Sequence, residues 1–175
     1  MKIGFCGTMS VGKTTLVNAL KELPEFKDYH FRTERSKHLM NLGIPLNTDS
    51  TLKGQLVFAA ERAAELMQEN IITDRTIIDV IAFSNLSTSM SNSEKHNIKT
   101  LLTPLINGYD FLFYVSPEGV EIEDNGVRET DANYRMAIDK EIKSIIQMHR
   151  SSAPIIKGTV KERIEQVKNI VAQYV

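Results

Sequence analysis

The sequence predicts an α/β fold in which a parallel β-sheet is covered by helices on both faces. Short apolar segments alternate with longer segments of helical periodicity along the chain. A glycine-rich turn that begins at Gly7 joins the first apolar segment to the first helical one. Gly7, Glu34, Asp74 and Ser116 each follow a predicted strand. Because ligands of such folds bind at the carboxyl ends of the strands, these residues mark the expected site.

The strand segments are short and mainly apolar, and turn or charged residues bound them. The predicted strands lie at residues 2–6, 29–33, 71–73, 111–115 and 155–156. The segments between them have helical periodicity, as Leu16, Leu20 and Leu23 show for the first one, which Pro24 follows. The predicted helices lie at residues 12–23, 35–42, 49–69, 77–84, 94–105, 131–150 and 160–175.

The third predicted helix is the most strongly patterned one. Asp49 or Ser50 is its expected N-cap. Its expected apolar face is formed by Leu52, Leu56, Ala59, Ala63 and Leu66. Residues 87–93 are polar and are expected to form a loop or a helix cap, and residues 118–125 an acidic loop.

Composition restricts the class of protein. The length of 175 residues fits one domain, and 42% of the residues are hydrophobic. The net charge of −1 gives no support for general polyanion binding. No apolar run of about 18 residues occurs, so no membrane span is expected. The start MKIGFCG leads directly into a strand pattern rather than a signal peptide, and Cys6 is the only cysteine. A reducing, cytoplasmic location is therefore expected, without a disulfide or a zinc site.

A phosphate-binding loop is the most specific motif, since the turn matches G-x-x-x-x-G-K-[ST] between a strand and a helix. Its glycines permit positive φ, and its N–H groups and the following helix attract an anion. Lys13 is expected to reach the β- and γ-phosphates of ATP, and the Thr14 hydroxyl to bind Mg²⁺. A plain glycine-rich turn is the alternative. The expected nucleotide-binding residues here are Gly7, Thr8, Met9, Ser10, Val11, Gly12, Lys13, Thr14 and Thr15.

Two further strand ends carry an acidic residue followed by arginine. Asp74 can hold Mg²⁺ through water beside Thr14, and Arg75 can neutralise phosphate or acceptor charge. The alternative is an exposed turn. Glu34 can accept the proton of an attacking hydroxyl or align it, and Arg35 can bind an acceptor phosphate. These two residues could instead form an ion pair that caps the next helix.

Three more parts of the chain have open roles. Asp79 lies about one helical turn beyond Arg75, where it could face the acceptor, orient Arg75 or be structural. Arg128 and Arg135 are expected to fold over ATP and balance the charge on the transferring phosphoryl group. The alternative is a surface helix whose arginines pair with nearby aspartates. Adenine contacts are expected from Gly158, Thr159 and Val160, unless Thr159 only caps the last helix.

Together these motifs resemble those of P-loop nucleoside and nucleotide kinases. The nearest resemblance is to the AAA-domain group (AAA_28) that includes the ribosylnicotinamide-kinase domain of NadR and phage-encoded relatives. It rests on GTMSVGKTT, Thr33-Glu34-Arg35, TDRTIID, DNGVR…NYR and IIKGTVKERI, and covers nearly the whole chain. The resemblance implies a P-loop NTPase three-layer sandwich with a five-stranded parallel sheet in order 2-3-1-4-5. A single domain over residues 1–175 with a lid at about 118–135 is expected. Related kinases are often dimers or larger, so a homodimer is one possible assembly, and no residue of the sequence fixes the oligomeric state.

The resemblance also implies roles for individual residues. Asp74-Arg75 is similar to the Asp-Arg motif of thymidylate and deoxynucleoside kinases, and Arg128 and Arg135 are similar to their lid arginines. Gln55 and Arg62 occupy the region where such kinases contact the acceptor. Two departures concern the acceptor, because the family's usual Glu-Pro is Glu34-Arg35 here and no aromatic residue follows Asp74-Arg75.

The acceptor therefore remains open at this point. The first hypothesis is an ATP- and Mg²⁺-dependent phosphotransferase that acts on a small nucleoside, nucleotide or related hydroxyl. The second is a DNA-modifying kinase that acts on a base such as a 5-hydroxymethyl pyrimidine, or on a DNA end. The third is an NTP-hydrolysing switch or assembly ATPase, which would need a sensor or a partner-supplied arginine. Either Glu34 or Asp74 is the expected base.

Overall fold

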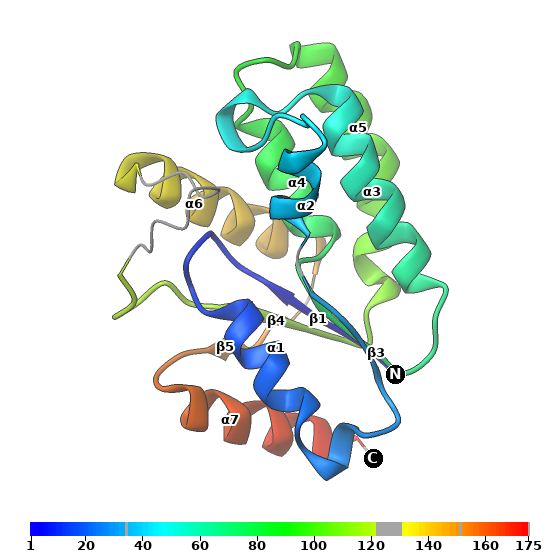
Figure 1. The fold of residues 1–175 in the computed structure, drawn as a ribbon, viewed down its shortest axis with the longest axis vertical. Helices are drawn as coiled ribbons and strands as arrows, with labels where there is room; N and C mark the ends of the chain where they lie inside the picture. Colours follow the sequence, from blue (N-terminus) through cyan, green and yellow to red (C-terminus); the bar gives the residue numbers. More distant parts are fainter. Residues whose placement is uncertain (34, 122–130, 151, 175) are drawn as a thin grey trace.

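A computed structural model describes residues 1–33, 35–121, 131–150 and 152–174 (Figure 1). The described strands form one parallel sheet in the order β2-β3-β1-β4-β5, which confirms the predicted topology. The strands are β1 (Lys2–Cys6), β2 (His30–Arg32), β3 (Ile71–Asp74), β4 (Phe111–Val115) and β5 (Ile155–Ile156). The central strand β1 pairs with β3 and β4, and Phe5 is aligned with Asp74 on one side and Phe113 on the other. This register brings the ends of β1 and β3 together.

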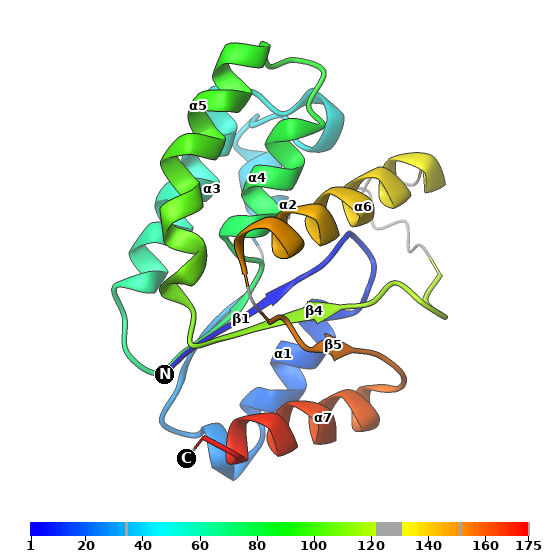
Figure 2. The same ribbon diagram turned by 180° about the vertical axis from the view of Figure 1, so that it is seen from behind.

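Helices cover both faces of the sheet, as predicted (Figures 1 and 2). One face carries α1 (Lys13–Lys21) and α7 (Val160–Ala172). The other face carries α2 (Ser36–Asn41), α3 (Leu52–Leu66), α4 (Ile77–Asn85), α5 (Asn92–Leu102) and α6 (Ala132–His149). Short 3₁₀ turns lie at η1 (Pro24–Phe26), η2 (Asn47–Asp49) and η3 (Thr103–Gly108). None of the described helices is both long and apolar enough to cross a bilayer.

Two hydrophobic cores form because neighbouring residues of a strand point to opposite faces of the sheet. Phe5 packs into the core beneath α1 and α7, together with Leu16 and Val167. The next residue, Cys6, packs into the core formed by the helices of the other face, together with Ile81. The sheet is thus buried on both sides, which explains why its strands read as apolar runs rather than as alternating patterns.

The helix α3 differs from its prediction at its start and on its buried face. Its N-cap is Thr51, whose hydroxyl accepts a hydrogen bond from the Gly54 N–H at 3.2 Å. Leu56, an expected core residue, is 42% exposed, whereas Gln55 and Arg62 are 3% and 2% exposed. Gln55 and Arg62 are buried because this face of α3 lines a pocket with both polar and apolar side chains as well as the core.

Two other predicted helices, at residues 94–105 and 131–150, also differ at their ends by a few residues. The helix α5 begins at Asn92 because Ser91 caps it, and it gives way to the 3₁₀ turn η3 from Thr103, where Pro104 follows. Asp131 is the cap of α6, since its carboxylate accepts hydrogen bonds from the N–H groups of Asn133 and Tyr134. In each case a side-chain cap fixed the first residue of the helix, and hydrophobic periodicity does not register such caps.

Candidate nucleotide-binding and acceptor site

The β1–α1 loop has the backbone of a phosphate-binding loop. Gly12 is the N-cap of α1 and has φ 80°, and Ser10 has φ 56°. Gly7 lies so close to β4 that an added Cβ would be 2.7 Å from the Val115 carbonyl oxygen. Gly12 is therefore required because its φ is positive, and Gly7 because the backbone of β4 lies too close for a side chain, as the sequence predicts.

The Lys13 ammonium is held inside this loop. The side chain is buried, and its Nζ donates hydrogen bonds to the carbonyl oxygens of Gly7 at 2.6 Å and Thr8 at 2.8 Å. The charge therefore lies within the loop, in the position from which a lysine meets the phosphates of a nucleotide.

Thr14 and Asp74 meet at the ends of β1 and β3. The Thr14 hydroxyl donates a hydrogen bond to Asp74 Oδ2. Asp74 is buried, and its Oδ1 has no hydrogen-bond partner among the described residues. Over the described ranges no group of three His, Cys, Asp or Glu residues could hold a metal ion. A hydroxyl and one carboxylate suit Mg²⁺, which keeps several waters and uses few protein ligands.

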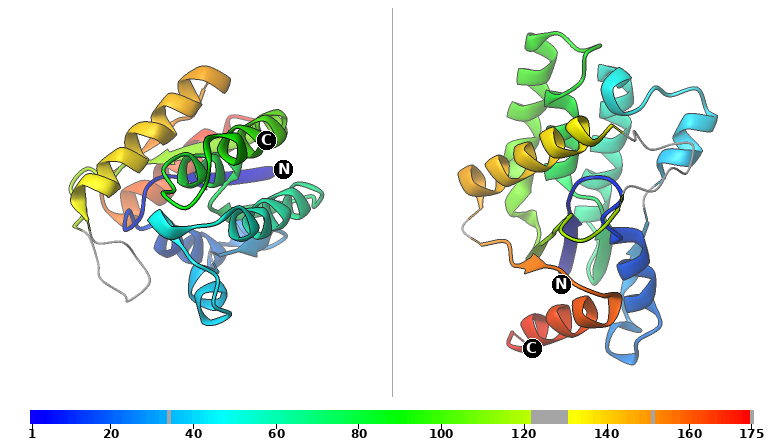
Figure 3. Two further views of the ribbon diagram at one scale, coloured as in Figure 1. Left: turned by 90° about the horizontal axis from the view of Figure 1, so that it is seen from above. Right: turned by 90° about the vertical axis from the view of Figure 1, so that its left-hand side faces the viewer.

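Arg135 connects α6 to the loop. Its guanidinium donates hydrogen bonds to the carbonyl oxygens of Met9 at 3.2 Å, Ser10 at 3.3 Å and Val120 at 2.9 Å. Its own carbonyl oxygen accepts a hydrogen bond from the Thr8 hydroxyl at 3.0 Å. In the right-hand view of Figure 3, the loop accordingly lies between α6 and the chain that follows β4. Burial lowers the pKa of Arg135, and Asp139 partly opposes this effect.

Arg163 is a second contact of the loop that was not predicted from the sequence. This buried residue of α7 donates hydrogen bonds to the Val11 carbonyl oxygen and, at 2.8 Å, to that of Gly158. Burial lowers its pKa. A signal for it exists in the sequence, because Arg163 has helical spacing with the buried residues Val167 and Val171. A charged residue on an apolar face needs a partner, and here the partner is the loop backbone.

The turn before α7 serves first as a helix cap. Thr159 accepts a hydrogen bond from the Glu162 N–H, and the Glu162 carboxylate accepts one from the Thr159 N–H, which makes a capping box. Gly158 has φ 93°. A shallow hollow beside this turn is lined by Glu118, Lys157, Gly158, Glu162 and Gln166. The capping role of Thr159 is therefore confirmed, and adenine contact at Gly158, Thr159 and Val160 stays a prediction.

A pocket lies beside the loop between α2, α3 and α4. It has about 380 Å³ of empty space, including the part open to solvent. Four sequence-predicted acceptor residues line it, namely Gln55, Arg62, Arg75 and Asp79. Its other lining residues were not predicted to belong to the site, and they are Ser36, Leu46, Asn47, Phe58, Val80 and Phe83. Of the remaining predicted residues, Arg35 is not among the lining residues, and Glu34 and Arg128 lie outside the described residues.

Asp79 joins the pocket to the loop. Its Oδ1 accepts a hydrogen bond from the Gly7 N–H at 3.2 Å. Its Oδ2 accepts hydrogen bonds from the Thr76 N–H at 2.7 Å and the Thr76 hydroxyl at 2.9 Å. Arg75, one residue before Thr76, has φ 88° and places its guanidinium 4.8 Å from the centre of the Phe83 ring. The geometry therefore gives Asp79 a positioning role between the loop and α4.

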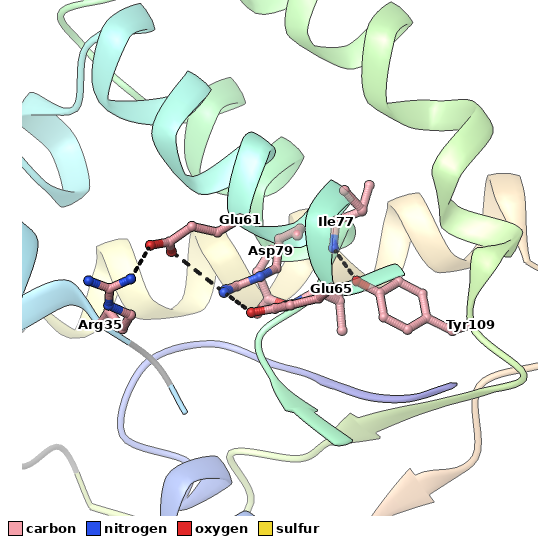
Figure 4. A network of polar contacts seen from close by, with 8 residues as sticks. Arg35, Glu61, Glu65, Ile77, Asp79 and Tyr109 are labelled. Atoms are coloured by element: carbon pink, nitrogen blue, oxygen red, sulfur yellow. Dashed lines mark hydrogen bonds and ion pairs between the residues drawn. The ribbon is translucent and has the colours of Figure 1, made fainter. Parts of the chain in front are cut away.

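Arg62, which lines the pocket from α3, forms ion pairs with two glutamates of the same helix (Figure 4). Arg62 Nη2 lies 2.7 Å from Glu65 Oε1 and 3.6 Å from Glu61 Oε2. Glu61 also pairs with Arg35 at 3.0 Å. Burial raises the pKa of Glu65, and the charge of Arg62 opposes this effect. Burial likewise disfavours the charged form of Arg62, but the carboxylate of Glu65 outweighs it, so the pKa of Arg62 is raised.

The fold and this loop define a P-loop nucleotide-binding protein. The chain belongs to the AAA_28 family, described as an AAA domain, whose model matches residues 2–163. Among curated proteins, none matches the chain in sequence.

Solved structures of two kinases and of the NadR protein share the fold. The chain is similar to deoxyadenosine kinase from M. mycoides with bound dCTP (TM-score 0.64, 18% identity), covering 99% of this chain and 100% of that one. NadR in complex with NR has a TM-score of 0.76 at 16% identity, and the match covers 98% of this chain and 50% of NadR. Thymidylate kinase from Ehrlichia chaffeensis has a TM-score of 0.63 at 19% identity, with 98% of each chain covered. At such identities the likeness concerns the fold.

Proposed function

We propose that this protein is a Mg²⁺-dependent kinase that transfers the γ-phosphoryl group of ATP to a hydroxyl or phosphate oxygen of a nucleoside, nucleotide or related acceptor. One observation carries the proposal: the phosphate loop adjoins a separate pocket, and Asp79 contacts both. A hydrolysing switch needs only the nucleotide site, whereas transfer needs a second site within reach of the γ-phosphate. The fold shared with deoxyadenosine kinase and thymidylate kinase supports the same reaction class.

The proposed transfer is an in-line displacement. The acceptor oxygen forms a bond to the γ-phosphorus, while the bond from that phosphorus to the β–γ bridging oxygen breaks and leaves its electron pair on ADP. The proton of an acceptor hydroxyl goes to a carboxylate, and we assign this task to Glu34 or to Asp74. Thr14 and Asp74 would hold Mg²⁺, which neutralises charge on the phosphates when bound.

Basic residues complete the proposed mechanism. Lys13 and the loop N–H groups hold the β- and γ-phosphates, in keeping with the buried position of the Lys13 ammonium. Arg75, Arg128 and Arg135 are assigned to balance the charge that develops on the transferring group. Of these, Arg135 already contacts the loop backbone.

The variant Lys13→Ala tests the proposal. We expect it to slow transfer by about 10²-fold or more, because a preorganised charge at the reacting phosphate is lost. Lys21→Ala is the matched control, since this exposed lysine lies in the same helix. Labelled ATP with Mg²⁺ is supplied to separate pools of nucleosides, nucleotides and DNA, including modified bases. Near-normal transfer by Lys13→Ala, or release of inorganic phosphate alone by the wild type, would contradict the proposal.

A further inference from the structure

The charges around the acceptor pocket are compensated within the protein. Arg62 lines the pocket and is 2% exposed, so its guanidinium is removed from bulk water. Glu65 lies 2.7 Å away and Glu61 3.6 Å away, and the pairing with Glu65 is also a hydrogen bond. A buried arginine with two carboxylates at these distances has little attraction left for a further anion.

The second arginine near the pocket is compensated in the same way. Arg35 pairs with Glu61 at 3.0 Å, so this one carboxylate lies between two guanidinium groups (Figure 4). Arg75 also lines the pocket, and so does Asp79, which carries a carboxylate. Arg35, Arg62 and Arg75 are therefore matched by the carboxylates of Glu61, Glu65 and Asp79, and Arg32 has a smaller effect on the pKa of Glu65. A phosphate monoester carries close to two negative charges at neutral pH and would need a clear excess of cations.

The neutral polar side chains that line the pocket favour an uncharged ligand as well. Asn47 and Gln55 line it, and each amide carries both donors and an acceptor. A hydroxyl or an amide can both donate and accept, so it suits a site that offers both kinds of atom. A phosphate dianion only accepts hydrogen bonds, and it would be repelled by Glu61 and Glu65.

We infer that the pocket takes a phosphate-free alcohol, such as a nucleoside, and discriminates against a nucleoside monophosphate. The inference rests on the proposed kinase function and restricts the class of acceptor molecules to those without a phosphate group. The aromatic side chains of Phe58 and Phe83 line the same pocket and offer apolar contact to a planar ring. The acceptor group that receives the phosphoryl is therefore a hydroxyl.

The direct test compares each nucleoside with its own 5′-monophosphate as acceptor, using the wild-type chain and Mg·ATP. We expect kcat/KM to be about tenfold or more higher for the best nucleoside than for any monophosphate. Equal or faster transfer to a monophosphate overturns the inference and leaves the kinase proposal intact. Absence of Mg·ATP binding, measured separately by calorimetry, overturns the kinase proposal and this inference with it.

A binding measurement keeps the inference testable if none of these acceptors is phosphorylated. Nucleosides and monophosphates are titrated by calorimetry into protein saturated with a non-hydrolysable ATP analogue. A nucleoside that binds about tenfold tighter than its monophosphate supports the inference. Tighter binding of a monophosphate, or binding of neither class by a protein that holds the analogue, overturns it.

The variant Glu61→Gln tests the physical cause. It removes the carboxylate that lies between Arg35 and Arg62, so we expect monophosphates to bind about tenfold tighter than to the wild type. Glu69→Gln is the control, because it removes the same charge from an exposed residue that pairs with Lys2 instead. Equal responses of the two variants, with folding verified by circular dichroism, would overturn the charge argument.

Discussion

The Asp79 carboxylate accepts hydrogen bonds from two separate parts of the candidate site. Three hydrogen bonds converge on it, one from Gly7 and two from Thr76, and the residue is fully buried. It therefore fixes the first residue of the phosphate loop relative to the start of α4. The sequence places Asp79 in the right region but leaves three roles open, because spacing alone cannot show which donors surround a carboxylate.

The substitution Asp79→Asn should destabilise the fold by about 1–3 kcal/mol, because an amide cannot accept all three hydrogen bonds and leaves buried donors unpaired. Denaturant unfolding measures this loss. Asp139→Asn is a useful comparison. The mostly buried Asp139 carboxylate accepts a hydrogen bond from the Tyr114 hydroxyl and pairs with Lys143 instead of bonding to the phosphate loop. If Asp79→Asn unfolds like the wild type and weakens only acceptor binding, Asp79 is an acceptor-binding residue rather than a positioning one.

At the level of elements, capping boxes fix the starts of several helices. They occur at α4 with Thr76 and Asp79, at α5 with Ser91 and Glu94, and at α7 with Thr159 and Glu162. Two of these caps adjoin the site, one at the pocket and one at the expected adenine position. The cap at Ser91 lies in neither region, so a substitution there serves as a control that affects stability but not the site.

Ser91→Ala and Thr159→Ala should each cost about 1 kcal/mol of stability, because each removes the hydroxyl that accepts the N3 N–H of its helix. Thermal unfolding measures both. Adenine contact at the turn before α7 further predicts that only Thr159→Ala weakens ATP binding. Equal ATP affinities of the two variants would limit Thr159 to its capping role.

At the scale of the whole molecule, the stability should depend on acidic pH through these same caps. Hydrogen bonds from the backbone and hydroxyl of Ser91 lower the pKa of Glu94, and those of Thr159 lower the pKa of Glu162. Both carboxylates bind protons more weakly in the folded state. Their contribution is therefore complete above the unfolded pKa of 4.5 and is lost as the pH falls through the folded values. The raised pKa of Glu65 acts in the opposite direction.

The double variant Glu94→Gln, Glu162→Gln should lose less thermal stability on acidification from about pH 5 to about pH 3 than the wild type does. Glutamine keeps a hydrogen-bond acceptor at each cap but does not titrate. Melting temperatures across this range measure the difference. Identical pH slopes for the two proteins would mean that other carboxylates account for acid unfolding.

Most of the architecture follows from local patterns in the sequence. The strands β4 and β5 have the predicted bounds, and the phosphate loop lies between β1 and α1 as its motif requires. The site was predicted in part, because Gln55, Arg62, Arg75 and Asp79 do line one pocket. The burial of Gln55, Arg62 and Glu65 on α3 was not predicted, because hydrophobic periodicity assigns apolar residues to the buried side of a helix.

The sequence by itself determined the elements, their order and the phosphate loop, because hydrophobic period, glycine conformation and motif spacing act over a few neighbouring residues. Only the tertiary structure decided which charges meet. Arg163 reaches the loop from a helix 152 residues away in the chain, and Glu61 lies between two arginines. Such contacts depend on packing in space, and the proposed preference for an uncharged acceptor rests on the balance of charge that they create.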